Sequence, residues 1–135
     1  MKLLLPAALL LLLSGCASIV GVGESATSIN AFRAANGLSA LRNDPAMGIL
    51  ARIHAEDMAR REALDHAGFH ERRGQAGAMA ENVAYGCAES ACTIKQWINS
   101  PGHRANMLLS GVGSYGMASA VSKSGRRYWA LELGK

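Results

Sequence analysis

The chain of 135 residues is poor in aromatic residues and has no long block of charge of one sign. Phe, Trp and Tyr make up 5% of it, and 14 Lys and Arg stand against 10 Asp and Glu. Nucleic-acid-binding proteins usually carry a basic patch or run, often with aromatic residues between the charges. The composition therefore argues against nucleic acid as a partner, although the small positive charge allows attraction to anionic polymers of a cell envelope.

Local motifs for catalysis and for metal binding are also absent. The sequence has no Gly-x-Ser-x-Gly, which argues against a serine hydrolase of that type. It has no expected helix that carries His-x-x-x-His or His-Glu-x-x-His. Its three cysteines, Cys16, Cys87 and Cys92, include no Cys-x-x-Cys pair, so a local cysteine zinc site is not expected.

The N-terminal stretch "MKLLLPAALLLLLSGCAS" is apolar, but its run is too short to span a bilayer as a permanent helix. It fits the apolar core of a signal peptide, and "LSGC" resembles the lipobox of bacterial lipoproteins. The resemblance implies that residues 1–15 are removed, that Cys16 carries lipid, and that residues 16–26 tether the protein to a membrane of the bacterial cell envelope. In a Gram-negative cell this is the outer membrane or a periplasmic face. The alternative is ordinary cleavage after Ala17, which gives a secreted protein.

The remaining two cysteines form an even pair in "CAESAC". An exported chain meets an oxidising compartment, where paired cysteines are usually oxidised. We therefore predict a Cys87–Cys92 disulfide.

Helical signals dominate the first half of the domain. Thr27 or Ser28 is expected to cap a helix over about 28–36. Asp44 and Pro45 predict the start of a long helix that ends near Leu64. Its expected buried face has apolar residues, and one histidine, at spacings of three or four: Met47, Leu50, Ala51, His54 and Met58.

The second half is expected to mix short elements. Residues 65–80 show no period and predict a long structured loop, and residues 81–86 predict a strand or turn. Short helices are expected at 93–99 and 103–108, and a hairpin at 112–121 and 127–133. Helices followed by a hairpin predict an α+β domain.

Six segments occur in a recognisable order: "NAFRAANGLSALRND", "ARIHAEDMA", "LDH", "ENVAYG", "WINSPGHRANML" and "YWALELG". Together they resemble the CAP superfamily in its bacterial, SCP-like extracellular branch. That family also contains cysteine-rich secretory proteins, antigen 5 allergens and plant pathogenesis-related proteins. The resemblance implies that residues 27–135 form an α–β–α sandwich with a surface cleft.

The resemblance also implies a site at the base of the cleft. His66, Glu81 and His103 match two histidines and one acid that meet there in the family. The second acid of many eukaryotic members is absent, since Asn99 and Ser100 occupy that neighbourhood. Two imidazoles and one carboxylate could bind a divalent metal such as zinc, although weakly, or form a structural polar network.

Two functions remain open at this stage. The first is a non-enzymatic, monomeric lipoprotein that binds a small or lipidic ligand, or an envelope partner, at the cleft. The alternative is a hydrolase that attacks peptide or ester bonds with metal-activated water or with a His/Glu acid–base pair.

Other conspicuous residues have simpler expected roles. His54 is expected in the core and His70 on an exposed loop. Arg104 and Asn106 are expected to fix their own turn. Three aromatic residues are expected in the core: Trp97, Tyr128 and Trp129. Two pairs of arginines are expected in solvent: Arg60 with Arg61, and Arg72 with Arg73.

Overall fold

The computed structural model describes residues 26–135. The expected signal peptide, the lipidated Cys16 and nearly all of the expected tether lie outside these residues. The elements are α1 (Ile29–Ala35), β1 (Arg42–Asn43), α2 (Pro45–Arg61), η1 (Phe69–Arg73), β2 (Ala78–Tyr85), α3 (Ser90–Ile98), α4 (Pro101–Met107), β3 (Ser114–Val121) and β4 (Arg127–Gly134). Among the described residues, no helix has the length and apolar character needed to cross a membrane.

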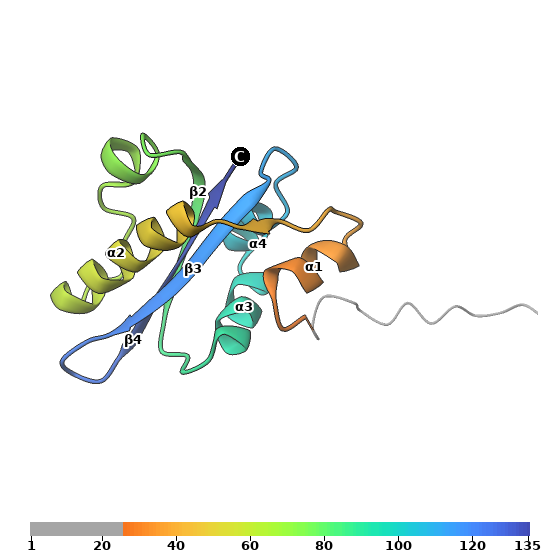
Figure 1. Cartoon of the computed structure of the whole chain (residues 1–135). Coiled ribbons are helices and arrows are strands. Elements are labelled where there is room, and N and C mark those ends of the chain that lie inside the picture. Colours follow the sequence, from red (N-terminus) through yellow and green to blue (C-terminus); the bar gives the residue numbers. More distant parts are fainter. Residues whose placement is uncertain (1–25) are drawn as a thin grey trace, which may run out of the picture.

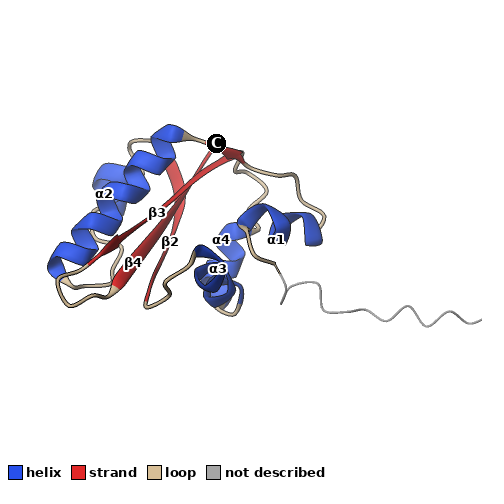
Figure 2. Cartoon of the chain, turned by 60° about the horizontal axis from the view of Figure 1, so that its bottom comes forward, coloured by secondary structure: helices blue, strands red, loops and turns tan. Residues whose placement is uncertain are grey.

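The fold has three layers, as the α–β–α prediction requires (Figures 1 and 2). Helix α2 covers one face of a four-stranded sheet, and α1, α3 and α4 lie on the other face. Ala51, Ala55 and Met58 of α2 pack with Val83 and Tyr128 in one apolar cluster. A larger cluster fills the other side and includes Phe32, Ile94, Trp97, Met107 and Leu131. The predicted α+β class is confirmed.

Strand order in the sheet is β1-β3-β4-β2. Strands β3 and β4 form the predicted hairpin, β1 runs parallel to β3, and β2 pairs antiparallel with β4. Strand β2 is therefore an edge strand, which brings its side chains to the rim between the two helical layers. In this register Glu81 lies directly opposite Glu132.

The long helix begins where the sequence indicates. The Asp44 side chain accepts a hydrogen bond from the Ala46 backbone N–H, with Pro45 at the first helical position. The helix ends at Arg61, three residues before the predicted end, because Glu62 adopts a left-handed backbone conformation with φ of 52°. His54 is buried on its inner face, so the prediction of a core histidine is confirmed.

Helix α2 crosses β3 at close range because β3 carries a glycine there. A Cβ on Gly116 would lie 2.0 Å from the backbone nitrogen of Gly48 and 2.3 Å from the carbonyl carbon of Met47. Both neighbours are backbone atoms of the helix, so only movement of α2 could relieve the overlap.

We expect Gly116→Ala to lower the free energy of unfolding by about 2–3 kcal/mol, because the core must expand. Gly48→Ala is the matched control: its Cβ would meet nothing within 4 Å, and alanine favours helix. This variant should gain about 0.5–1 kcal/mol. Chemical denaturation measures the free energy of unfolding of both variants. Equal changes in the two would contradict the conclusion that Gly116 permits the close crossing of α2 and β3.

The other layer is held to the sheet by buried tryptophans. The indole N–H of Trp97 donates to the Val83 carbonyl at 3.0 Å, and that of Trp129 donates to the Cys87 carbonyl at 2.9 Å. Trp97, Tyr128 and Trp129 are buried, which confirms them as core residues. The predicted Cys87–Cys92 disulfide is present between β2 and α3, with its Cα atoms 5.7 Å apart.

Replacing both of these cysteines with serine should cost about 2 kcal/mol of unfolding free energy, since the bridge closes a short loop. The circular dichroism spectrum should keep its native form at 25 °C. A thermal melt with and without reductant on the wild type provides the same comparison. Complete loss of structure would show that the bridge holds far more of the fold than its loop length implies.

Residues 65–80 differ from the predicted loop. They contain the π-helical turn η1, and β2 already begins at Ala78. Gly68 and Gly77, with φ of 71° and 104°, supply the left-handed conformations on either side of η1. A five-residue turn of this kind has no apolar period, which is why the sequence pattern did not reveal it.

Candidate functional site

Two glutamates are buried side by side where β2 pairs with β4. Glu81 is 5% exposed and Glu132 is fully buried. Alternation along β4 puts Glu132 on the same face as Tyr128 and Ala130, beneath α2. Like charges directly opposite each other in a sheet are unfavourable, so this pair needs a cation or a proton.

The cation is Arg73, at the end of η1. Its Nε donates to Oε2 of Glu81, and its Nη2 donates to Oε1 of Glu81 at 3.0 Å. A third donor, Nη1, reaches the Ala67 carbonyl at 3.0 Å. Arg73 is only 4% exposed, so the prediction that it lies in solvent is wrong. The buried carboxylate explains why: this guanidinium is the partner that lets Glu81 stay charged inside the protein.

The second glutamate lies close to the same guanidinium without being hydrogen-bonded to it. Oε1 of Glu132 is 3.1 Å from Nε of Arg73, but the single Nε hydrogen is directed at Glu81. Neither carboxyl oxygen of Glu132 receives a hydrogen bond from any other group in the described chain. A proton on Glu132 supplies the missing hydrogen, which it can then donate to Glu81.

The two carboxyl groups accordingly have pKa values displaced in opposite directions. Burial, together with the neighbouring Glu81, raises the pKa of Glu132 to about 10. Burial also works to raise the pKa of Glu81, but hydrogen bonds from Glu132, Arg73 and His66 outweigh it and hold that pKa below its ordinary value. At neutral pH the pair therefore consists of a Glu81 carboxylate and a Glu132 acid.

His66 lies at the rim of this buried cluster. Its Nδ1 is 2.7 Å from Oε1 of Glu81, while its side chain is 54% exposed. The ring opens on a cavity of about 440 Å³, lined also by Phe69, His70, Met79 and Asn106. His70 is exposed, as predicted, although it lies in η1 rather than in a loop.

His54 contacts the cluster from α2. Its Nε2 is 2.9 Å from the Asp65 carbonyl and 3.7 Å from Oε1 of Glu81. Burial lowers its pKa, so the ring is neutral at pH 7. Because a carbonyl can only accept, Nε2 carries the hydrogen. Nδ1 has no partner in the described chain, and His54 is not among the residues that line this cavity.

His103 reaches the same edge of the sheet from α4. Two asparagines hold this helix against β2. The Asn82 amide donates to the His103 carbonyl at 2.9 Å, and the Asn106 amide donates to the Glu81 carbonyl at 3.1 Å and to Oδ1 of Asn82 at 3.0 Å. Asn106 was predicted to fix its own turn, but its side chain instead joins α4 to β2. Arg104 is exposed.

The histidine ring itself is partly buried. It lies 6.4 Å from the Trp97 ring, centroid to centroid, and lines a second cavity of about 370 Å³ together with Tyr85, Gln96 and Ser100. Burial lowers the pKa of His103, and the nearby His66 lowers it further. The Pro101-Gly102 turn before it starts a seven-residue helix, which sets His103 at its third position.

Asn106→Ala should lower the free energy of unfolding by about 2 kcal/mol, because it strips a donor from the Glu81 carbonyl and from the buried Asn82 side chain. The control is Asn99→Ala at the exposed end of α3, which should change stability by less than about 0.5 kcal/mol. Urea denaturation measures both. A loss no larger for Asn106 than for Asn99 would contradict its role in joining α4 to β2.

The structure pairs His66 with Glu81 directly and brings His103 to the same edge. Within residues 26–135, no group of three or more His, Cys, Asp or Glu side chains is arranged to hold a metal ion. Both carboxylate oxygens of Glu81 already accept hydrogen bonds from Arg73 or His66, so few lone pairs are left to bind a metal ion. Weak metal binding by His66, Glu81 and His103 stays a prediction.

Sequence patterns missed Arg73 and Glu132. The arginine follows another arginine in a segment without a period, so it resembles a solvated charge. A signal for the glutamate did exist. In "RYWALEL", Trp129, Leu131 and Leu133 fill one face of β4, and Tyr128 and Ala130 fill the other. A strand that is apolar on both faces is covered on both, so Glu132 had to be buried.

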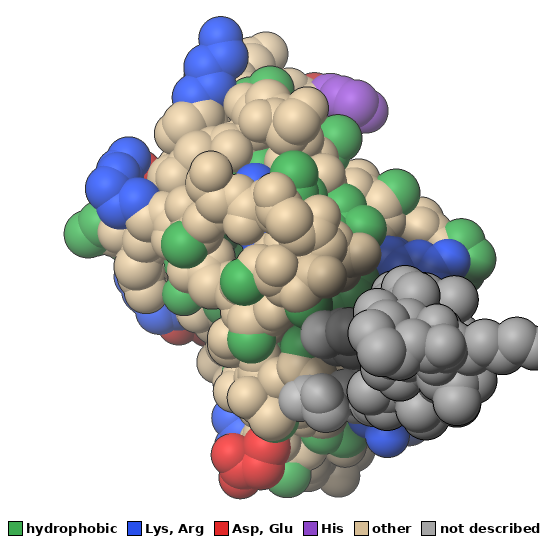
Figure 3. All heavy atoms as spheres, turned by 90° about the vertical axis from the view of Figure 1, so that its right-hand side faces the viewer, with side chains coloured by type: hydrophobic (Ala, Val, Ile, Leu, Met, Phe, Trp, Pro, Cys, Tyr) green, Lys and Arg blue, Asp and Glu red, His purple; other side chains and the backbone are tan. Residues whose placement is uncertain are grey.

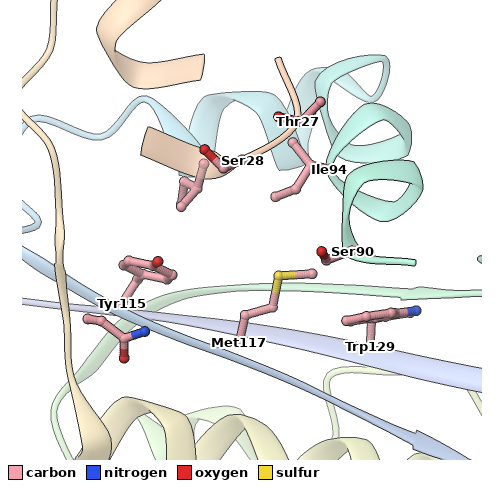
Figure 4. Close-up of a pocket in the computed structure, with 9 residues that line it drawn as sticks. Thr27, Ser28, Ser90, Ile94, Tyr115, Met117 and Trp129 are labelled. Atoms are coloured by element: carbon pink, nitrogen blue, oxygen red, sulfur yellow. The ribbon is translucent and has the colours of Figure 1, made fainter. Parts of the chain in front are cut away.

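A separate hollow lies on the far side of the sheet from α2. This cavity of about 250 Å³ is bounded by Tyr115, Met117 and Trp129 from the strands and by Ile94 and Ser28 from the helical side (Figure 4). None of the three predicted site residues lines it. On the face seen in Figure 3, Lys and Arg side chains lie at separate places and form no continuous patch.

Comparison with known proteins matches the described domain to one family. The profile of the cysteine-rich secretory protein family, CAP, covers residues 27–133. No curated protein matches the sequence significantly.

Solved structures give the same fold. An outer surface protein from Borrelia burgdorferi has 16% identity and a TM-score of 0.64, over 79% of this chain and 86% of that one. An extracellular protein with an SCP domain from Bacillus anthracis has 25% identity and a TM-score of 0.64, over 79% of this chain but 38% of that one. A cysteine-rich secretory protein from Staphylococcus aureus has 22% identity and a TM-score of 0.56, over 79% and 36%. The expected resemblance is confirmed, and the chain belongs to the CAP, or cysteine-rich secretory protein, family.

Proposed function

We propose that this protein is a cell-envelope lipoprotein, anchored through Cys16, whose CAP domain binds a small or lipidic ligand, or an envelope partner, at the cleft beside His66, Glu81 and His103. The main observation in favour of a binding role is that both oxygens of the Glu81 carboxylate are already hydrogen-bonded inside the protein. This carboxylate is buried and receives hydrogen bonds from Arg73 and His66. A general base must have a free lone pair within reach of the substrate, and Glu81 is poorly placed to offer one.

Two cavities along the β2 edge support a role in ligand binding rather than in catalysis. Each is of a size that suits small ligands. The cavity beside His103 has mainly apolar walls, and the cavity beside His66 adds several polar groups to an apolar part. The bacterial relatives described as outer surface or extracellular proteins support an exported location. The lipid anchor is supported by "LSGC" alone.

Extraction of the full chain, purified from bacterial membranes, tests both parts. Mass spectrometry should find an acylated N-terminal peptide beginning at Cys16, and denaturation should release a small molecule that a His66→Ala, His103→Ala double variant does not carry. An unmodified peptide beginning at Ser18 would overturn the anchor. Release of nothing by either protein would overturn the binding role.

A hydrolase is the second candidate, because a carboxylate bonded to a histidine is also how a general-base imidazole is oriented. Peptide and ester substrates should be offered to the same preparation. Turnover that disappears in His66→Ala and survives in His70→Ala would replace the binding module with an enzyme.

A further inference from the structure

We infer that the cavity beside His66 selects ligands that present a hydrogen-bond donor, an alcohol or an ammonium group, and rejects carboxylates. The inference rests on the binding function proposed above and gives it a chemical class. It follows from the directions of the hydrogen bonds that His66 and Asn106 make at the cavity wall.

The first step is the direction of the His66–Glu81 bond. Arg73 donates two hydrogen bonds to the Glu81 carboxylate, which is the charge-assisted, two-point contact that an ionised carboxyl group makes. An ionised carboxylate accepts hydrogen bonds and cannot donate them. Nδ1 of His66, 2.7 Å from Oε1, must therefore be the donor.

The second step concerns the other ring nitrogen. An uncharged imidazole has one N–H, and here it is committed to Glu81. Nε2 is then a bare acceptor on a ring that is 54% exposed and lines the cavity of about 440 Å³. A ligand gains from His66 only by donating a hydrogen bond to it.

The third step is the rest of the lining. Phe69 and Met79 contribute apolar surface, and the Glu81 carboxyl group and the exposed His70 ring also line the cavity. The Asn106 amide nitrogen donates to two acceptors, the Glu81 carbonyl and Oδ1 of Asn82, and this use of both hydrogens fixes the orientation of the amide. Its oxygen is left as a second acceptor. A carboxylate brought beside these acceptors finds no free donor on either residue, which costs affinity.

Three probes of equal ring size test the selection: benzyl alcohol, benzylammonium and benzoate. Each is titrated into the full chain at pH 8, above the range in which an ordinary imidazole titrates, with His66 and Met79 resonances followed by NMR. Benzyl alcohol and benzylammonium should bind saturably, and benzoate at least tenfold more weakly. Long-range ¹H–¹⁵N spectra should show hydrogen on Nδ1 of His66 and none on Nε2.

His66→Phe keeps a ring at the rim but removes the acceptor, so the preference for donors over benzoate should disappear. If the preference instead disappears in His70→Phe and survives in His66→Phe, the acceptor is not His66 and the inference fails. Benzoate binding as tightly as the alcohol, or a hydrogen on Nε2 of His66, also overturns it. If no probe binds, the ligand-binding role is contradicted for this cavity, and the ¹⁵N spectra still decide the direction of the His66–Glu81 bond.

Discussion

Replacing Arg73 with methionine should lower the free energy of unfolding by about 3–5 kcal/mol at pH 7. The change leaves the Glu81 carboxylate inside the protein without its cation, beside a second carboxyl group. Breaking one half of a buried ion pair is costly because the surviving charge has lost both water and partner. Chemical denaturation with fluorescence of Trp97 and Trp129 measures the loss.

The neighbouring arginine provides the matched control. Arg72 is exposed, and within residues 26–135 the one hydrogen bond of its side chain is to the Ala67 carbonyl, at 3.4 Å, so Arg72→Met should cost less than about 1 kcal/mol. Adding Glu81→Gln to Arg73→Met should recover part of the loss, since the uncompensated charge is then gone. Equal losses for the two arginines, or no recovery in the double variant, would contradict the buried pair.

The second large effect concerns Glu132 and pH. A carboxyl group whose pKa is raised on folding binds its proton in the native state at pH values where the unfolded chain has released it. Stability from this group is complete below the ordinary glutamate range and is lost as pH rises toward about 10. Between pH 7 and pH 9 the unfolding free energy of the wild type should therefore fall, by about 1 kcal/mol per pH unit.

Glu132→Gln should remove this slope and stabilise the protein at pH 9, because glutamine has nearly the shape of the protonated acid and can donate to Glu81. The other buried groups add little slope between pH 8 and pH 9, and near pH 7 the buried histidines act in the opposite direction. His54 and His103 have lowered pKa values in the fold, and in the unfolded chain they are almost fully uncharged from about pH 8 upward, while Glu81 is ionised in both states. Denaturation curves at pH 7, 8 and 9 give the comparison. A variant with the wild-type slope, or one less stable at pH 9, would refute a neutral Glu132.

The parts of the fold that the sequence predicted are those formed by interactions between residues close together in the chain. Asp44 and Pro45 define the start of α2 because capping is a local interaction between neighbouring residues. The β3–β4 hairpin and the Cys87–Cys92 bridge are equally local, and both were predicted. The site residues His66, Glu81 and His103 came from family resemblance, since nothing in their spacing brings them together.

The cluster behind the site depends on contacts between distant segments. Arg73 meets Glu81 because η1 folds back against β2, and η1 has no periodic pattern. Glu132 meets Glu81 only through strand register, which the sequence of either strand alone does not fix. Asn82 and Asn106 similarly join α4 to β2 across 24 residues of sequence. The partners in such contacts are far apart in the sequence, so they can be identified only once the fold is known.

The most direct test of the account is the ionisation of the two glutamates in the native wild type. Selective ¹³C labelling of glutamate, with assignment by Glu81→Gln and Glu132→Gln, lets NMR follow each carboxyl carbon from pH 4 to pH 9. The account predicts a Glu81 carboxylate and a protonated Glu132 at pH 7, with Glu132 losing its proton only at alkaline pH. Two ionised carboxylates at pH 7, or a protonated Glu81 beside an ionised Glu132, would contradict it, and the second result would also remove the basis for the donor-selective cavity.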